Sequence, residues 1–143
     1  MIFNNKYILC ISLILIISCN SSNNNGYKNG VVVSAKIEAS QAGISILKQG
    51  GNAFDAMIAT DLALSVVYPN AGNLGGGGFL VYRLSDSSYG SLDFREKSPS
   101  QANKNMFLDD NENEIKGLST EGGLSVGVPG TVAGLFEVYE KYA

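Results

Sequence analysis

The 143-residue sequence has the length of one domain, is 45% hydrophobic and carries a formal net charge of −3. It contains no histidine, which excludes Ser-His-Asp and Cys-His catalysis and the common zinc sites, because all of these use an imidazole. The mild negative charge, without a basic run, gives no indication of a nucleic-acid partner.

Residues 1–18 have the pattern of a lipoprotein-type signal peptide. Lys6 precedes the apolar run 7–17, which is too short to span a membrane as a stable helix. Residues 16–19 read IISC and resemble a bacterial lipobox, with isoleucine in place of the usual leucine. We therefore expect cleavage before Cys19, lipidation of Cys19, and a lipid-anchored protein of the bacterial cell envelope, facing the periplasm or the surface. An ordinary secretory signal or an N-terminal membrane anchor is the alternative.

Residues 19–30 are expected to form a flexible polar tether, because asparagine, serine and glycine dominate them and no apolar periodicity is present. A mature chain that begins at Cys19 has lost Cys10 with the signal peptide. No disulfide can then form within one chain. The folded part is predicted to comprise residues 31–143.

The first half of this folded part contains a predicted strand and two predicted helices. Residues 30–35 are rich in β-branched side chains, which favour a strand. Residues 40–49 have a helical spacing of small and apolar side chains. A second helix, 53–67, is apolar nearly all round, begins after the capping residue Asn52 and ends before Pro69. The face of the first helix comprises Ala39, Ala42, Gly43, Ile46 and Leu47.

A β-hairpin and a last helix are predicted in the second half. The hairpin has arms 79–84 and 89–95, joined by a polar turn. Residues 98–123 are polar and turn-rich, which is typical of a solvated surface loop. The last helix opens at residues 129–131. Its predicted apolar stripe consists of Val132, Leu135, Phe136 and Tyr139.

The four consecutive glycines, Gly75–Gly78, call for a physical explanation. Loops that cradle phosphate follow a strand and open a helix, whereas here a helix precedes the glycines and a strand follows them. The pattern instead predicts a close approach of the backbone to another backbone segment or to a ligand, where a Cβ atom would clash.

Arg95 ends the hairpin between two acids, Asp93 and Glu96. The two-residue period of a strand places Arg95 and Asp93 on one face, and Leu92 and Phe94 on the other. A guanidinium matches a carboxylate in bidentate geometry, so Arg95 is a candidate for binding a substrate carboxylate. The alternative is a structural ion pair with Asp93 or Glu96.

Five motifs occur in one order along the chain: GGNAFDA, AGNLGGGGF, DFRE, MFLDD and GVPGTVAG. Over residues 31–143 they resemble the N-terminal part of the large subunit of the γ-glutamyltranspeptidases (glutathione hydrolases). Ser98 departs from the alanine that is common in the family. The resemblance implies an α+β fold, an incomplete N-terminal-nucleophile hydrolase αββα sandwich with the N-terminal helices plus a β-hairpin. Unpartnered layers should expose strand edges and apolar faces.

The activity implied by the resemblance is cleavage of the γ-glutamyl amide of glutathione or another γ-glutamyl compound. The glutamyl group passes to an N-terminal threonine and then to water or an amino acceptor. The arginine of DFRE binds the α-carboxylate in the family, which implies substrate binding by Arg95. The nucleophile lies beyond Ala143 in the family, and Thr131 is expected to be a helix cap. We therefore assign no catalytic residue, metal or cofactor here.

The resemblance also implies a partner, namely the missing C-terminal (small-subunit) part, without which the chain is expected to be inactive. Two other hypotheses remain. A related N-terminal-nucleophile acylase shares the threonine chemistry but need not bind an α-amino acid carboxylate. A non-catalytic lipoprotein that binds γ-glutamyl compounds, or a decayed gene product, needs no nucleophile at all.

Overall fold

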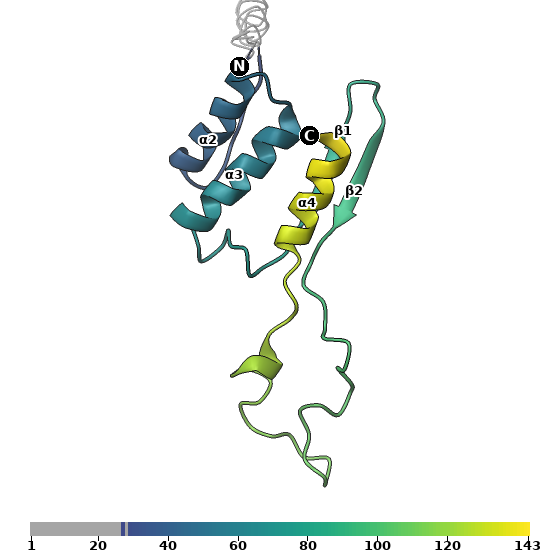
Figure 1. Cartoon of the computed structure of the whole chain (residues 1–143). Coiled ribbons are helices and arrows are strands. Elements are labelled where there is room, and N and C mark those ends of the chain that lie inside the picture. The colour runs from purple at the N-terminus through teal and green to yellow at the C-terminus, as the bar shows by residue number, and fades with distance from the viewer. Residues whose placement is uncertain (1–26, 28) are drawn as a thin grey trace, which may run out of the picture. The chain divides into compact units, whose positions relative to one another are not determined.

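The computed structural model describes residue 27 and residues 29–143, so the predicted signal peptide and Cys19 lie outside the described residues. The chain divides into two units, Met1–Gly30 and Val31–Ala143, and the fold below is that of the second. It contains, in chain order, the helices and strands α2 (Ile37–Lys48), α3 (Ala53–Val67), β1 (Phe79–Arg83), β2 (Tyr89–Asp93), the short 3₁₀ helix η1 (Gly123–Ser125) and α4 (Thr131–Tyr142) (Figure 1). Helices and a two-stranded sheet confirm the predicted α+β arrangement. Within the described residues, no helix has the length and apolar character needed to cross a membrane.

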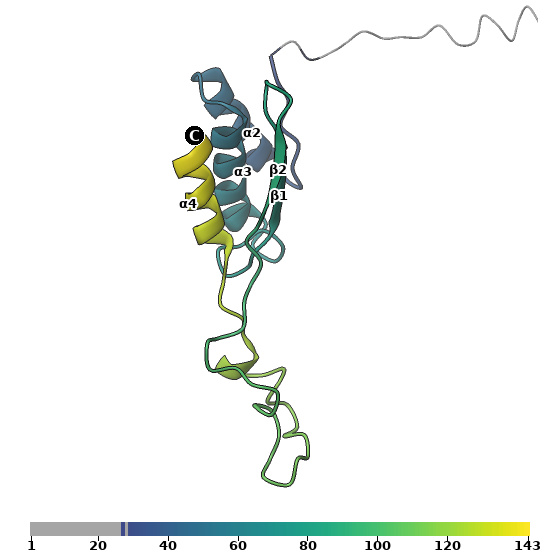
Figure 2. The same ribbon diagram turned by 90° about the vertical axis from the view of Figure 1, so that its right-hand side faces the viewer.

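Helices α2 and α3 pack side by side through small residues (Figures 1 and 2). A Cβ atom at Gly43 would overlap the Thr60 hydroxyl and would lie 3.0 Å from the Ala56 carbonyl oxygen. Gly43 therefore allows the two helices to approach, and Ala39 is completely buried beside it. The predicted face of this helix is confirmed, although the helix begins at Ile37 rather than at residue 40.

Both ends of α3 follow the local sequence signals. The Asn52 side chain accepts hydrogen bonds from the backbone N–H groups of Phe54 (2.7 Å) and Asp55 (3.2 Å). The Asp55 carboxylate in turn accepts one from the Asn52 N–H (2.8 Å), which completes a capping box. At the other end Tyr68, which precedes Pro69, has left the helical region with φ −146° and ψ 53°. These contacts confirm the predicted start and end of the helix.

The surface of α3 is only partly buried by the other described residues. Ala56 and Thr60 are buried, but the side chain of Val66 is 77% exposed. Asp61 is half-buried, and this burial raises the pKa of its carboxyl group. The apolar character of the helix on nearly every side therefore exceeds what this unit alone can bury.

Strands β1 and β2 form an antiparallel hairpin in the register Phe79↔Asp93 to Arg83↔Tyr89. Its exposure alternates along both strands. Leu80 and Leu92 lie on the inner face, which α3 and α4 cover in Figure 2. The outer face exposes three large apolar side chains: Phe79, Val81 and Tyr89.

The predicted strand at residues 30–35 is absent. Val33 is 85% exposed, and no described residue pairs with this segment. A β-branched sequence favours the extended conformation, but it becomes a strand only where a neighbour completes the hydrogen-bonded ladder. Val32 packs instead against α2, where its Cγ1 would lie 3.0 Å from a Cβ atom at Gly43.

Helix α4 buries a different face from the one predicted. Only Leu135 of the expected stripe is buried, and Val132, Phe136 and Tyr139 are exposed. The buried face consists of Thr131, Gly134, Leu135 and Val138. The physical reason is close packing at Gly134, which a count of large apolar side chains does not register.

An aromatic cluster joins α3, β1 and α4. The ring of Tyr142 stacks on Phe54 with centroids 4.7 Å apart and lies 5.0 Å from the ring of Tyr82. The Tyr82 and Tyr142 hydroxyls are hydrogen-bonded at 2.6 Å, and this bond raises the pKa of Tyr82. The Asn52 side chain also donates to the Tyr142 carbonyl (2.7 Å). The C-terminal end of α4 is thereby fixed to the start of α3.

Residues 98–123 form a loop that runs away from the helices and is largely exposed, as predicted (Figure 1). Its two ends are held together by Lys97 and Val128, whose backbone groups exchange hydrogen bonds of 3.1 and 2.8 Å. Among the described residues, no group of three or more acidic, cysteine or histidine side chains could hold a metal ion.

Candidate functional site

Three motifs that are far apart in sequence meet at the N-terminus of α4. They are AGNLGGGGF, DFRE and GVPGTVAG. The carbonyl oxygen of Gly76 accepts hydrogen bonds from the backbone N–H groups of Gly130 (2.8 Å) and Thr131 (3.1 Å). The first N–H groups of a helix have no partner inside the helix, so the glycine run supplies an acceptor for them. DFRE lies between the glycine run and α4.

Gly77 explains why this run excludes side chains. A Cβ atom there would lie 2.6 Å from the Phe94 carbonyl oxygen, 2.7 Å from the Arg95 Cα and 2.8 Å from the Glu96 nitrogen. All three atoms belong to the backbone and cannot rotate away. Of the two predicted alternatives, approach to another backbone segment or to a ligand, the structure shows the first at Gly77. Gly75 differs, because its nearest neighbour would be 3.4 Å away, an ordinary contact.

Phe94 is held by three glycines. A Cβ atom at Gly134 would overlap the Phe94 ring, one at Gly130 would overlap its carbonyl, and one at Gly78 would lie 2.9 Å from the ring. Phe94 also extends the hairpin by one pair, since its N–H donates to the Gly78 carbonyl (3.0 Å). The residue before Arg95 is therefore fixed through both its side chain and its backbone.

Glycines of a second motif also approach this backbone. A Cβ atom at Gly127 would lie 3.1 Å from the Glu96 Cβ, and one at Gly130 would lie 3.0 Å from the Arg95 carbonyl oxygen. The backbone of residues 94–96 is consequently in close contact with three glycines from two distant motifs. We call Gly77, Gly127 and Gly130 the glycine slot.

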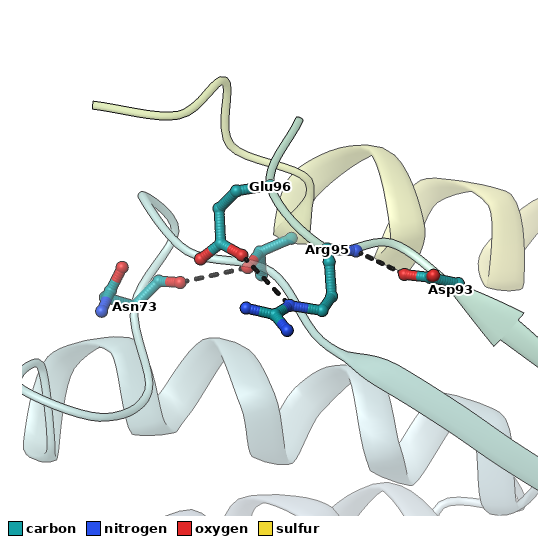
Figure 3. Close-up of polar contacts among 5 residues, drawn as sticks. Asn73, Asp93, Arg95 and Glu96 are labelled. Atoms are coloured by element: carbon teal, nitrogen blue, oxygen red, sulfur yellow. Dashed lines mark hydrogen bonds and ion pairs between the residues drawn. The ribbon is translucent and has the colours of Figure 1, made fainter. Parts of the chain in front are cut away.

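Strand β2 ends at Asp93, before the predicted end at residue 95, because Asp93 begins a turn. Its carboxylate accepts a hydrogen bond from the Arg95 N–H at 3.0 Å (Figure 3). An aspartate that accepts from the N–H two residues ahead closes such a turn in place of a ladder bond. Exposure still alternates through Phe94 and Arg95, so Arg95 stays on the outer side of the hairpin, as predicted.

The Arg95 guanidinium is largely open to solvent. Its side chain is 64% exposed, and its Nε lies 3.8 Å from the Glu96 carboxylate (Figure 3). Its Cζ lies 5.8 Å from the centre of the Phe79 ring. A long ion pair between partly exposed groups contributes little to stability. Asp93, the other candidate for a structural ion pair, binds the Arg95 backbone N–H instead.

Thr131 does not act as the predicted helix cap. Gly130 occupies the capping position, and no side chain caps α4. Thr131 is the first residue of the helix and is 6% exposed, and its hydroxyl donates to the Asn73 carbonyl at 3.2 Å. Its hydroxyl joins the start of α4 to the segment before the glycine run. Asn73 gave no signal of this role in the sequence, because its partner is 58 residues away.

Known proteins of similar sequence and structure agree with this geometry. Helices packed on one face of a sheet, with a second face left open, correspond to part of an N-terminal-nucleophile hydrolase. The chain belongs to the Gamma-glutamyltranspeptidase family, whose sequence model matches residues 39–143.

The similar curated proteins include the glutathione hydrolase proenzymes of Pseudomonas sp. strain A14 and Escherichia coli K12. The first is 56% identical over 117 residues, covering 82% of this chain and 20% of the relative. The second is 47% identical over 115 residues, covering 80% and 20%. The chain thus spans about a fifth of the length of these relatives.

Similar solved structures include the γ-glutamyltranspeptidase of Helicobacter pylori, with a TM-score of 0.76 and 50% identity over 81% of this chain and 33% of that one. The transpeptidase CapD of Bacillus anthracis is similar at a TM-score of 0.61 and 27% identity, over 82% of this chain and 33% of that one.

Proposed function

We propose that this chain supplies part of the substrate-binding site of a γ-glutamyltransferase/glutathione hydrolase, and that Arg95 binds the α-carboxylate of the γ-glutamyl group. The observation that carries the proposal is that Arg95 has a fixed backbone and an exposed side chain. Its backbone is held by the glycine slot, while its guanidinium is exposed beside one distant carboxylate. A planar fork of donors on a fixed backbone suits bidentate binding of a carboxylate.

The reaction itself requires groups from outside this chain. In the proposed mechanism a threonine at a newly formed N-terminus attacks the γ-glutamyl amide, with its own α-amine as the base. The amide C–N bond breaks, the amine leaves with a proton, and the glutamyl group remains as an ester on the threonine oxygen. Water or an amino acceptor then attacks this ester and takes the glutamyl group, which restores the threonine hydroxyl. The C-terminal, small-subunit part supplies this threonine and is the proposed partner of the chain. No metal or cofactor enters this scheme.

Arg95→Lys tests the proposal in a fusion enzyme, made by joining this chain at Ala143 to the remainder of the Helicobacter pylori relative. Lysine keeps the charge but loses the bidentate fork. Hydrogen bonds to charged groups contribute about 1.5–3 kcal/mol, and each 1.4 kcal/mol is about a factor of ten. We expect kcat/KM for a γ-glutamyl anilide to fall by about tenfold or more.

The control substrate is 4-aminobutyryl anilide, which is the same compound without the α-carboxylate. The loss caused by Arg95→Lys should shrink for this substrate, because the contact is then absent in the unmodified enzyme too. The control variant is Arg83→Lys, on the same hairpin, where the guanidinium donates to Ser87. Equal impairment of both substrates by Arg95→Lys would make Arg95 a structural residue and would favour a related acylase.

We further propose that Cys19 is lipidated and anchors the protein in the cell envelope, because the apolar run 7–17 leads directly into the lipobox-like residues 16–19. Cys19→Ala should block lipoprotein processing and leave the precursor uncut, as measured by mass spectrometry of the membrane fraction. Cys10→Ala, in the same apolar run, is the matched control and should be processed normally. An unmodified Cys19 in the mature protein would contradict the proposal.

A further inference from the structure

Arg95 combines a tightly held backbone with an open side chain. Its N–H is bonded to Asp93, and the preceding Phe94 N–H is bonded to Gly78. Two residues later, Lys97 exchanges backbone hydrogen bonds with Val128. The guanidinium, by contrast, forms one ion pair with the described residues, the 3.8 Å contact to Glu96. A backbone fixed on both sides of one exposed cation defines where that cation can reach.

The glycine slot sets this position by steric contact. The Arg95 Cα is 2.7 Å from the point where a Cβ atom of Gly77 would lie. Cβ atoms at Gly130 and Gly127 would lie 3.0 Å from the Arg95 carbonyl oxygen and 3.1 Å from the Glu96 Cβ. A side chain at any of these glycines would therefore displace the backbone that carries Arg95.

We propose that Gly77 and Gly127 are positioning residues that act through Arg95 and hold its guanidinium in register with a substrate carboxylate. The inference rests on the proposed function of Arg95. Carbon atoms in contact are about 3.5–4.0 Å apart, so a methyl group at Gly77 displaces the Arg95 Cα by roughly 1 Å. A misplacement of this size can cost on the order of a hundredfold in kcat/KM, and bidentate binding depends on geometry at both oxygens.

Gly127 provides a milder displacement, at the residue after Arg95. Its Cβ atom would meet the Glu96 Cβ at 3.1 Å, which a shift of a few tenths of an ångström relieves. Alanine at Gly127 should thus have the same kind of effect as alanine at Gly77, with a smaller magnitude. Gly75 is the matched control within the glycine run, because a methyl group there makes only an ordinary contact.

The experiment compares Gly77→Ala, Gly127→Ala and Gly75→Ala in the fusion enzyme, with γ-glutamyl anilide and with 4-aminobutyryl anilide. For Gly77→Ala we expect KM for the γ-glutamyl anilide to rise by about tenfold or more, with a smaller change in kcat. The effect should shrink for 4-aminobutyryl anilide. Gly127→Ala should show a weaker form of the same pattern, and Gly75→Ala should match the unmodified enzyme.

A double variant separates positioning from general damage. If Gly77 acts through Arg95, then Gly77→Ala combined with Arg95→Lys should be little worse than Arg95→Lys alone. Equal losses on both substrates in Gly77→Ala and Gly127→Ala, or fully additive losses in the double variant, would overturn the inference while leaving the role of Arg95 intact. If Gly77→Ala does not fold, Gly127→Ala decides the question alone. If Arg95→Lys shows no dependence on the α-carboxylate, the proposed function itself fails.

Discussion

Gly130→Ala is expected to destroy the folded unit. The new methyl group would overlap the Phe94 carbonyl oxygen and lie 2.8 Å from the Phe94 carbonyl carbon and 3.0 Å from the Arg95 carbonyl oxygen. Overpacking typically costs 1–3 kcal/mol where side chains can adjust, and here the obstacles are backbone atoms. A total stability of about 5–15 kcal/mol is usual for a domain, so the loss is a large fraction of what holds a small unit together.

The cost is compounded because Gly130 occupies the capping position of α4 and its N–H donates to Gly76. A shift at this point therefore also withdraws an acceptor from the start of the helix. In the fusion enzyme, urea unfolding followed by circular dichroism should show that Gly130→Ala abolishes the cooperative transition or moves it to much lower urea. Gly123→Ala is the control, because no described residue other than its chain neighbours has an atom within 4 Å of its Cβ position. Equal midpoints for the Gly130→Ala and unmodified fusion enzymes would show that the slot is not rigid.

The chain by itself is expected to release no product from γ-glutamyl anilide, whereas the fusion enzyme should turn it over. Enzymes accelerate reactions by about 10⁶-fold or more, so the difference between the two proteins is the largest predicted effect. The sequence has no histidine, and the Thr131 hydroxyl is buried and bonded to Asn73. The sequence therefore offers no imidazole base, and the Thr131 hydroxyl is not free to act as a nucleophile.

The measurement is release of the anilide chromophore by the purified chain, against buffer and against the fusion enzyme. Thr131→Val removes the hydroxyl while keeping the size and branching of the side chain. Turnover by the chain alone that persists in Thr131→Val would show that residues 1–143 contain catalytic machinery of their own. Absence of turnover in the fusion enzyme as well would contradict the proposed partnership with the C-terminal part.

Local signals predicted much of the fold. The capping residue Asn52 and the helix-ending Pro69 act on their immediate neighbours, so their effects are readable from the sequence. The hairpin follows from alternation and a polar turn. The glycine run predicted a close backbone approach at Gly77, although the sequence could not tell that DFRE is the approaching segment.

What the sequence did not predict depends on contacts between distant segments. The face of α4 that is buried is set by the fit of Gly134 against Phe94, and no periodicity of apolar residues encodes that fit. Thr131 sits at a helix start, where a cap is the common role, but its partner Asn73 lies far away in the chain. Residues 30–35 have strand propensity without a described partner.

The outer face of the hairpin has a thermodynamic consequence. Arg95 and the exposed apolar side chains of Phe79, Val81 and Tyr89 lie on the same side. A polypeptide layer that covers this face removes water from the apolar surface and, at the same time, lowers the effective dielectric constant around the guanidinium. Attraction for an anion then strengthens as the layer docks. By linkage, a bound carboxylate strengthens the docking by the same free energy, so that ligand and assembly stabilise each other.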